Sequence, residues 1–129
     1  MKAQILRDSA LKADDRESIT ATGAGQVSAA PKIIDLGTQY KISPVLLAVV
    51  EDVVRDLADT DETYRFHIQL SSDSGFAQVN QEHLADIDED GDFVLPFIPH
   101  YRYVRAFFTL GGTTPDLVNK GTQIGVYER

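Results

Sequence analysis

Residues 92–112 form a hydrophobic stretch with turn signals at both ends, and this stretch constrains the fold more than any other part of the sequence. An Asp-Gly-Asp sequence leads into it and a Gly-Gly pair ends it. Pro96 and Pro99 lack the backbone N–H that a sheet ladder needs. The stretch therefore divides into a short strand near residues 93–95 and a longer strand over residues 101–110, which we predict to be central in its sheet.

The longer strand is predicted to have one buried face and one partly covered face, because side chains alternate across a strand. The predicted core face carries Arg102, Val104, Ala106, Phe108 and Leu110. The opposite face carries Tyr103, Arg105, Phe107 and Thr109. Its aromatic residues and its arginine fit a surface that is only partly covered.

Two further stretches are predicted to be strands that flank a turn. Residues 63–70 alternate strictly between apolar and polar side chains, as in an antiparallel strand with one wet face. Residues 45–57 place apolar side chains at helical spacing, but five valines in ten residues favour a strand, because β-branched side chains pack well on a pleated surface. The acids at residues 59–62 then form the turn between the two.

The remaining elements are short and separated by turn signals. We expect residues 8–17 to be a loop or a frayed helical turn, and residues 80–92 to be a polar crossing between strands. Residues 111–121 are expected to form a loop. Short strands are expected at residues 4–7, 32–37, 76–79 and 123–127. This pattern, without a convincing helix, predicts an all-β antiparallel sandwich or barrel.

The length of 129 residues predicts one domain, residues 1–129, with residues 1–15 as either an N-terminal arm or an edge strand. The sequence has no cysteine, so an apolar core must supply the stability. The longest apolar run, residues 45–50, is far too short to span a bilayer, and no apolar signal region follows Met1-Lys2. We therefore expect a soluble protein without a secretion signal and without a membrane partner.

The net charge of −8 argues against a nucleic-acid partner, because phosphate contacts need a basic surface. Most of the charge is concentrated: residues 51–92 hold thirteen acids against Arg55 and Arg65, a net charge of −11. Such an acidic band usually keeps a protein soluble. A second interpretation is that one end of the molecule faces solvent and the other docks onto a partner.

No motif predicts catalysis, a cofactor or a metal. Residues 86–92 begin like a calcium loop, but the twelfth position, which needs a bidentate carboxylate, is Phe97. We therefore expect an acidic turn there, and we expect millimolar calcium or a chelator to leave the melting temperature of the protein nearly unchanged. The three histidines share no ligand spacing, and His67 is expected to be solvated. Gly23-x-Gly25 has no third glycine and is predicted to be a loop. Pro96-x-x-Pro99 is predicted to be a rigid corner.

Several short motifs follow one another in an order that is itself informative. They are Asp8-Ser9 with Leu11, the segment Ile19-Thr20-Ala21-Thr22, the stop Ile34-Asp35-Leu36-Gly37, the valine-rich residues 45–54, residues 69–76, and Arg102-Tyr103-Val104-Arg105 leading to Thr109-Leu110-Gly111-Gly112. In this order the chain resembles the small cement, or decoration, proteins of tailed-bacteriophage capsids. Its heavy acidity between residues 52 and 92, and Glu51-Asp52 within the valine-rich stretch, depart from that family.

The resemblance implies a jelly-roll-like sandwich that self-associates as a homodimer or homotrimer and binds the major capsid protein on the outer surface of the virion, after synthesis in the host cytoplasm. It implies no catalysis. The residues predicted to lie in capsid or subunit interfaces are Ile5, Leu6, Leu11, Tyr40, Tyr101, Tyr103 and Arg105. The alternative is a non-enzymatic binding module, for carbohydrate or protein, on a phage tail or fibre, since the tyrosines could form aromatic platforms.

Overall fold

The structure is a computed structural model that describes residues 2–3, 11–37 and 45–128. These residues form strands and no α-helix. The strands are β1 (Lys2–Ala3), β2 (Lys12–Asp14), β3 (Ser18–Ile19), β4 (Gly23–Ala24), β5 (Gln26–Val27), β6 (Ala30–Pro31), β7 (Ile34–Asp35), β8 (Leu46–Arg55), β9 (Thr63–Ser71), β10 (Gln81–Asp86), β11 (Gly91–Phe97), β12 (Tyr103–Gly111), β13 (Leu117–Val118) and β14 (Thr122–Glu128).

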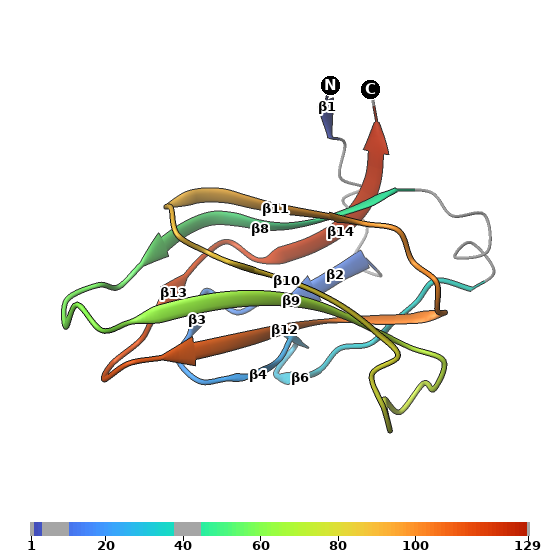
Figure 1. Ribbon diagram of the computed structural model, residues 1–129, viewed down its shortest axis with the longest axis horizontal. Helices are drawn as coiled ribbons and strands as arrows, with labels where there is room; N and C mark the ends of the chain where they lie inside the picture. Colours follow the sequence, from blue (N-terminus) through green and yellow to red (C-terminus); the bar gives the residue numbers. More distant parts are fainter. Residues whose placement is uncertain (1, 4–10, 38–44, 129) are drawn as a thin grey trace.

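The strands pair antiparallel in two main sheets that lie one above the other (Figure 1). In the first sheet, β8 pairs with β11, β14 and β13, while β14 also pairs with β1 and β2, and β13 with β3. In the second sheet, β10, β9 and β12 are neighbours in that order, and β4 and β7 pair with β12. A small β5–β6 hairpin completes the fold. The prediction of an all-β antiparallel sandwich is confirmed.

The core lies between the sheets and is centred on β9 and β12, the two strands that alternate most regularly. Phe108 pairs in register with Phe66, and their ring centroids are 5.3 Å apart. Both side chains are fully buried. The predicted faces of residues 101–110 are confirmed except at Arg102, which is exposed and pairs with Asp35. The predicted buried face of residues 63–70 is confirmed as well, but the opposite face is not solvated throughout, because Gln69 is buried.

The valine-rich stretch is a strand, β8, and it contains a β-bulge. Val53 pairs with Gly91 and Val50 with Phe93, so Glu51 and Asp52 together oppose the single residue Asp92. Asp52 has a φ of 47° and its N–H donates to Asp92 Oδ1 at 2.9 Å. Strict alternation after Val50 would direct Asp52 into the core. The extra residue of the bulge places Val53 there instead.

Pro96 does not end the strand before it, in contrast to our prediction. β11 continues through Pro96 to Phe97, and the corner comes at Pro99. The reason is that β11 pairs with β8 alone among the described strands, so it is an edge strand. An edge strand needs ladder hydrogen bonds on one side only, and proline is tolerated where its missing N–H would face outward.

The polar crossing predicted for residues 80–92 is wrong, because residues 81–86 form the strand β10. β10 pairs only with β9 among the described strands, and its side chains alternate between half-buried and exposed. An edge strand of this kind lacks the apolar pattern of a buried one. The strand predicted at residues 76–79 is absent, and Phe76 adopts a φ of 51° in a turn.

The loop or frayed turn predicted for residues 8–17 is also wrong, because residues 12–14 form the strand β2. Ala13 and Asp14 are fully buried there. The Asp14 carboxylate accepts hydrogen bonds from the Arg16 guanidinium, at 2.6 Å from Nη2, and from the N–H of Gln26 at 3.2 Å. A paired and hydrogen-bonded carboxylate can be buried without a large penalty. The predicted strand at residues 4–7 lies outside the described residues.

Smaller differences concern the short strands. The strand predicted for residues 32–37 is confirmed only over Ile34–Asp35, as β7, and the predicted loop over residues 111–121 contains β13. The last predicted strand is confirmed as β14. β7 and β13 have two residues each, which is too short for an alternation of apolar and polar side chains to be recognised in the sequence.

Gly25 marks the place where the two sheets come closest along the β2 edge. Its N–H donates to the carbonyl of Ala106 in β12 at 2.9 Å. A Cβ atom at this position would lie 2.4 Å from the carbonyl oxygen of Ala13 in β2. Close backbone approach therefore requires glycine at position 25, whereas a Cβ atom at Gly23 would meet nothing within 4 Å. The loop predicted for Gly23-x-Gly25 is wrong in part, because Gly23–Ala24 forms the strand β4, which pairs with β12.

Candidate functional site

The outer face of the first sheet is apolar across two neighbouring strands. We call it the β8–β11 face and define it by Val45, Leu47, Val49, Val94, Pro96 and Ile98. Val94 pairs with Val49 and Pro96 with Leu47, on the side opposite the core residues of the same strands. Leu47 and Val49 are buried, whereas Val94 and Ile98 are 45% and 42% exposed.

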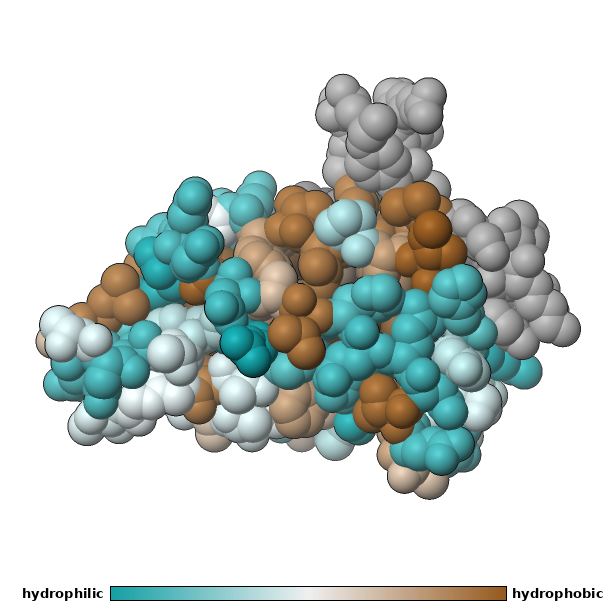
Figure 2. Space-filling model, viewed as in Figure 1, coloured by the Kyte–Doolittle hydropathy of each residue, from teal (hydrophilic) through white to brown (hydrophobic). Residues whose placement is uncertain are grey.

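Hydrophobic residues gather over the β8–β11 side of the molecule, with hydrophilic residues beside and below them (Figure 2). Antiparallel sandwiches usually turn polar side chains to solvent on the outer faces of their sheets. A contiguous apolar outer face is instead typical of a surface that contacts a partner. The β8–β11 face is therefore the first candidate interaction surface.

The outer face of the second sheet carries a hydrogen-bonded polar chain across three strands, which we call the β9–β12 network. Arg105 Nε donates to Gln69 Oε1 at 2.8 Å, and Gln69 Nε2 donates to Glu82 Oε2 at 2.7 Å. Glu82 Oε2 lies 3.0 Å from His67 Nδ1, and His67 Nε2 lies 2.8 Å from Thr109 Oγ1.

Arg105 in this network is also held against aromatic rings. Its guanidinium lies 4.5 Å from the ring centroid of Phe76 and 5.7 Å from that of Phe107. Burial lowers the pKa of Arg105, and the negative charge of Glu82 opposes that shift. A guanidinium fixed by stacking and by a hydrogen bond costs little further entropy when it binds a partner.

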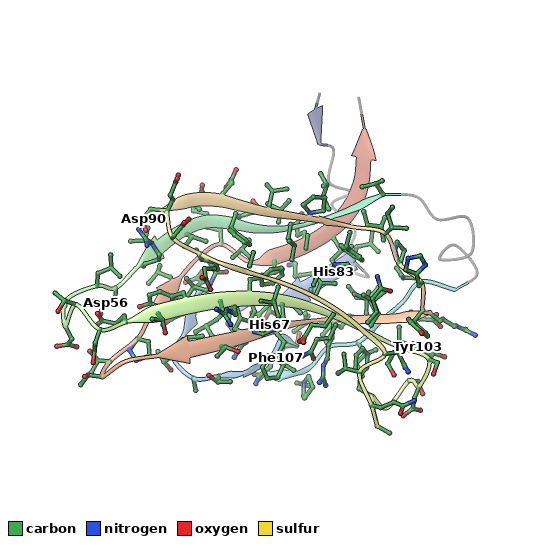
Figure 3. The ribbon with its side chains drawn as sticks, in the orientation of Figure 1. Asp56, His67, His83, Asp90, Tyr103 and Phe107 are labelled. Carbon is green, nitrogen blue, oxygen red and sulfur yellow. The ribbon has the colours of Figure 1, made fainter. Side chains whose placement is uncertain are left out.

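His67 is not solvated as we expected. It lies between Glu82 and Thr109, its ring packs edge-on against Phe107 with centroids 5.6 Å apart, and only 12% of its side chain is exposed. Figure 3 shows His67 and Phe107 close together near the middle of the sheet. The alternation correctly placed His67 on the outer face, but its partners Glu82 and Thr109 belong to β10 and β12. The pattern of β9 alone therefore does not reveal that His67 is covered.

The predicted interface residues fall into three groups. Tyr103 and Arg105 lie on the outer face of β12, where the Arg102 guanidinium is 5.3 Å from the ring centroid of Tyr103. Leu11 and Tyr101 are partly buried and pack against the core. The other three, Ile5, Leu6 and Tyr40, lie outside the described residues.

Three of the five acids in residues 86–92 have separate hydrogen-bond or ion-pair partners. Asp86 pairs with Arg65 at 2.8 Å and Asp90 with Arg55 at 3.0 Å, while Asp92 caps the bulge of β8. The N–H and guanidinium of Arg55 hydrogen-bond to Asp90 and lower its pKa. These residues act as an acidic turn that ties the β10–β11 connection to β8 and β9.

A cleft of about 470 Å³ lies beside this turn, between the ends of β8, β9 and β10. Its lining residues are Arg55, Glu62, Thr63, Tyr64, Arg65, Asp86, Ile87, Asp88 and Thr109. Both arginines of the lining are already paired with aspartates. A ligand in this cleft would therefore meet carboxylates and hydroxyls rather than an arginine without an ion-pair partner.

Sequence reasoning missed the β8–β11 face, although a signal for it was present. Residues 45–50 are apolar without interruption, so both faces of that strand must be apolar. A half-buried strand alternates, whereas a strand covered on both faces does not.

A scan against protein-family models found no match, and a search among curated proteins found none either. In the described part of the chain, no helix is long and apolar enough to cross a membrane.

Proposed function

We propose that this protein is a structural virion protein that decorates the outer surface of a tailed-phage capsid and stabilises contacts between subunits of the major capsid protein. The proposal builds on the ordered sequence resemblance to capsid cement proteins, and the all-β sandwich is compatible with it. In this role the protein needs no cofactor and no catalytic residue. It is made in the host cytoplasm and ends on the virion surface.

The observation that carries the proposal is the β8–β11 face, and we assign it to the capsid shell. Val94 and Pro96 are exposed on the edge strand β11, and Ile98 is exposed one residue beyond its end. Burying apolar surface in a contact stabilises the complex by roughly 25 cal/mol of free energy per Å². The acidic remainder of the surface keeps free molecules apart, so the apolar face is the part that gains most by contact with a large, neutral partner.

Attachment to several shell subunits at once would strengthen a small contact. A homodimer or homotrimer that touches two or three capsid subunits converts its second contact into an intramolecular event with a high effective concentration. Self-association therefore belongs to the proposed function.

Co-sedimentation with emptied capsids of the same virus tests the assignment. We expect the protein to pellet with the shells, and Val94→Lys to weaken binding by about tenfold or more, which corresponds to about 1.4 kcal/mol. Leu84→Lys is the matched control, because Leu84 is 48% exposed on the opposite sheet. Failure of the wild-type protein to pellet rejects the cement function. Loss of binding in Leu84→Lys alone would move the docking face to the second sheet.

The predicted role of the N-terminal segment needs a shorter deletion than residues 1–15, because β2 belongs to the folded sheet and Asp14 is buried. Deletion of residues 1–10 spares β2 and removes from the sheet only the two-residue strand β1, which pairs with the end of β14. We expect it to weaken capsid attachment more than it lowers the melting temperature of the free protein. Equal capsid binding by the truncated protein would show that the arm has no role.

A non-enzymatic binding module of a phage tail or fibre is the second candidate, and the β9–β12 network favours it. Tyr103 and Phe107 are half-exposed there beside a fixed guanidinium, an arrangement suited to stacking against a sugar or a protein side chain. Binding to a glycan array that is lost in Tyr103→Ser, together with no binding to capsids, would favour this candidate.

A further inference from the structure

The loop between β8 and β9 brings three carboxylates together. One carboxylate oxygen each from Asp59, Asp61 and Glu62 lies within 4.8 Å of the other two. Asp59 and Asp61 are exposed, whereas Glu62 is only 8% exposed. None of the three forms an ion pair with a described lysine, arginine or histidine. Three like charges at this separation repel one another unless a cation lies among them.

Glu62 supplies a second, independent observation that points to a ligand, because one of its carboxylate oxygens is buried without a hydrogen-bond partner. Its Oε2 accepts a hydrogen bond from the N–H of Asp59 at 3.0 Å. Its Oε1 is buried from solvent and has no hydrogen-bond partner. A buried polar atom without a partner is rare and costly, and it costs more when it carries charge. A cation bound between the three carboxylates would satisfy this oxygen.

The loop that contains Thr113 and Thr114 orients the carboxylates of Asp59 and Asp61 through hydrogen bonds. Thr113 donates to both oxygens of Asp61, from Oγ1 at 2.7 Å and from its N–H at 3.2 Å, and Thr114 Oγ1 donates to Asp59. Gly112 allows this approach, because a Cβ atom there would lie 2.7 Å from the carbonyl oxygen of Asp61. Hydrogen bonds that fix ligand orientation are the usual second layer of a cation site.

We propose that Asp59, Asp61 and Glu62 bind a hard divalent cation of the calcium type. The cluster offers oxygen atoms only, which suits calcium or magnesium and not a thiophilic metal. Calcium–oxygen distances of about 2.3–2.6 Å allow two ligands of one ion to be up to about 5 Å apart. Water fills the remaining positions on the exposed side, so we expect weak binding, with a Kd of about 10⁻⁴–10⁻³ M. This site is distinct from residues 86–92 and independent of the proposed capsid function. It predicts a calcium response, in contrast to the expectation from residues 86–92, which did not consider residues 59–62.

Thermal unfolding at constant ionic strength, with calcium or with a chelator, tests the site. We expect 5 mM calcium to raise the melting temperature of the wild-type protein by about 3–6 °C, because a ligand that binds only the folded state stabilises it. Glu62→Gln and Asp61→Asn should lose this rise. Glu89→Gln is the matched control: Glu89 is exposed and does not line the cleft beside Glu62, so the variant removes the same charge from the neighbouring acidic run and should keep the rise.

Terbium luminescence provides a readout that does not depend on stability. Tyr64 lies two residues after Glu62 and lines the same cleft, so it can transfer excitation to a bound terbium ion. We expect tyrosine-sensitised emission from the wild-type protein and from Glu89→Gln, and we expect calcium to displace the terbium in both. We expect no emission from Glu62→Gln or Asp59→Asn. Emission or a calcium response that survives Glu62→Gln in folded protein overturns the site. No response of the wild-type protein overturns it as well.

Discussion

At the scale of single residues, Asp35 and Arg102 form a two-pronged ion pair between β7 and β12. Arg102 Nε donates to Asp35 Oδ1 at 2.7 Å and Arg102 Nη2 to Oδ2 at 2.9 Å, while the N–H of Gly37 donates to Oδ1. These bonds, the one from Arg102 first, lower the Asp35 pKa to about 2. Both side chains are about half exposed, so solvent screens much of the attraction.

The Asp35 pair predicts a pH dependence with a defined sign. The carboxyl pKa is lower in the folded state than its ordinary value of 3.8, so the pair stabilises the fold above about pH 4 and loses its effect as the pH falls toward 2. An NMR titration should give a pKa near 2 for Asp35, and Arg102→Gln should move it back toward 3.8. Arg65→Gln, which removes a different ion pair, should leave it unchanged. If the pKa of Asp35 is the same in Arg102→Gln as in the wild-type protein, the prediction is wrong.

At the scale of elements, the strands of the core could be predicted and the edge strands could not. β9 and β12 alternate because one face of each is buried, and β8 is rich in valine because both its faces are apolar. β10 has no such pattern, since it lies at an edge, and β11 accommodates Pro96 for the same reason. The bulge in β8 depends on hydrogen bonding by Asp92 from another strand, which no local pattern of Glu51-Asp52 reveals.

The bulge makes position 52 sensitive to side-chain shape. A β-branched residue at a φ of 47° is strained, so Asp52→Val should cost roughly 2 kcal/mol of unfolding free energy. Asp52→Gly should be neutral or stabilising by up to about 1 kcal/mol, because glycine adopts this conformation without strain. Urea denaturation measures both. A cost of Asp52→Val below about 0.5 kcal/mol would argue against a left-handed residue here.

The two faces of β12 predict different costs for adjacent truncations. Phe108→Ala removes a fully buried ring next to Phe66 and should cost roughly 3–5 kcal/mol. Phe107→Ala removes a half-buried ring from the outer face and should cost about 1 kcal/mol. Equilibrium denaturation of both variants checks the assignment. Reversal of the two costs would mean that the faces of β12 are inverted.

At the scale of the whole molecule, the sandwich is closed on one side and open on the other. The segment around Gly25 joins β2 of the first sheet to β12 of the second. On the opposite side, β10 and β11 follow each other in the chain but do not pair. The β8–β11 face and the carboxylates of residues 59–62 both depend on contacts between parts of the chain that are far apart in the sequence. The acids at residues 59–62 are visible in the sequence, but Thr113 and Thr114, which orient them, come from a loop some fifty residues later.

Because the sheets are joined on the β2 side, replacing Gly25 by alanine should cost far more stability than replacing Gly23 by alanine. Gly25→Ala places a Cβ atom 2.4 Å from the Ala13 carbonyl oxygen and 3.3 Å from the Ala106 Cβ, so it should cost roughly 1–3 kcal/mol by overpacking. Gly23→Ala meets no atom within 4 Å and should have little effect. Thermal melts of the two variants separate these outcomes. A stable Gly25→Ala protein would show that the sheets can move apart at this edge.

The pairing of β14 with β8, β1 and β2 has a consequence for the order of folding during synthesis. The ribosome releases β8 with its apolar residues long before β14, which is needed to cover its second edge. Until then β8 has a hydrogen-bonding edge open to other nascent chains, and such edges promote aggregation. A high proportion of contacts between distant residues also slows folding. We therefore expect chains stalled before residue 122 to depend on chaperones, and complete chains to fold after release.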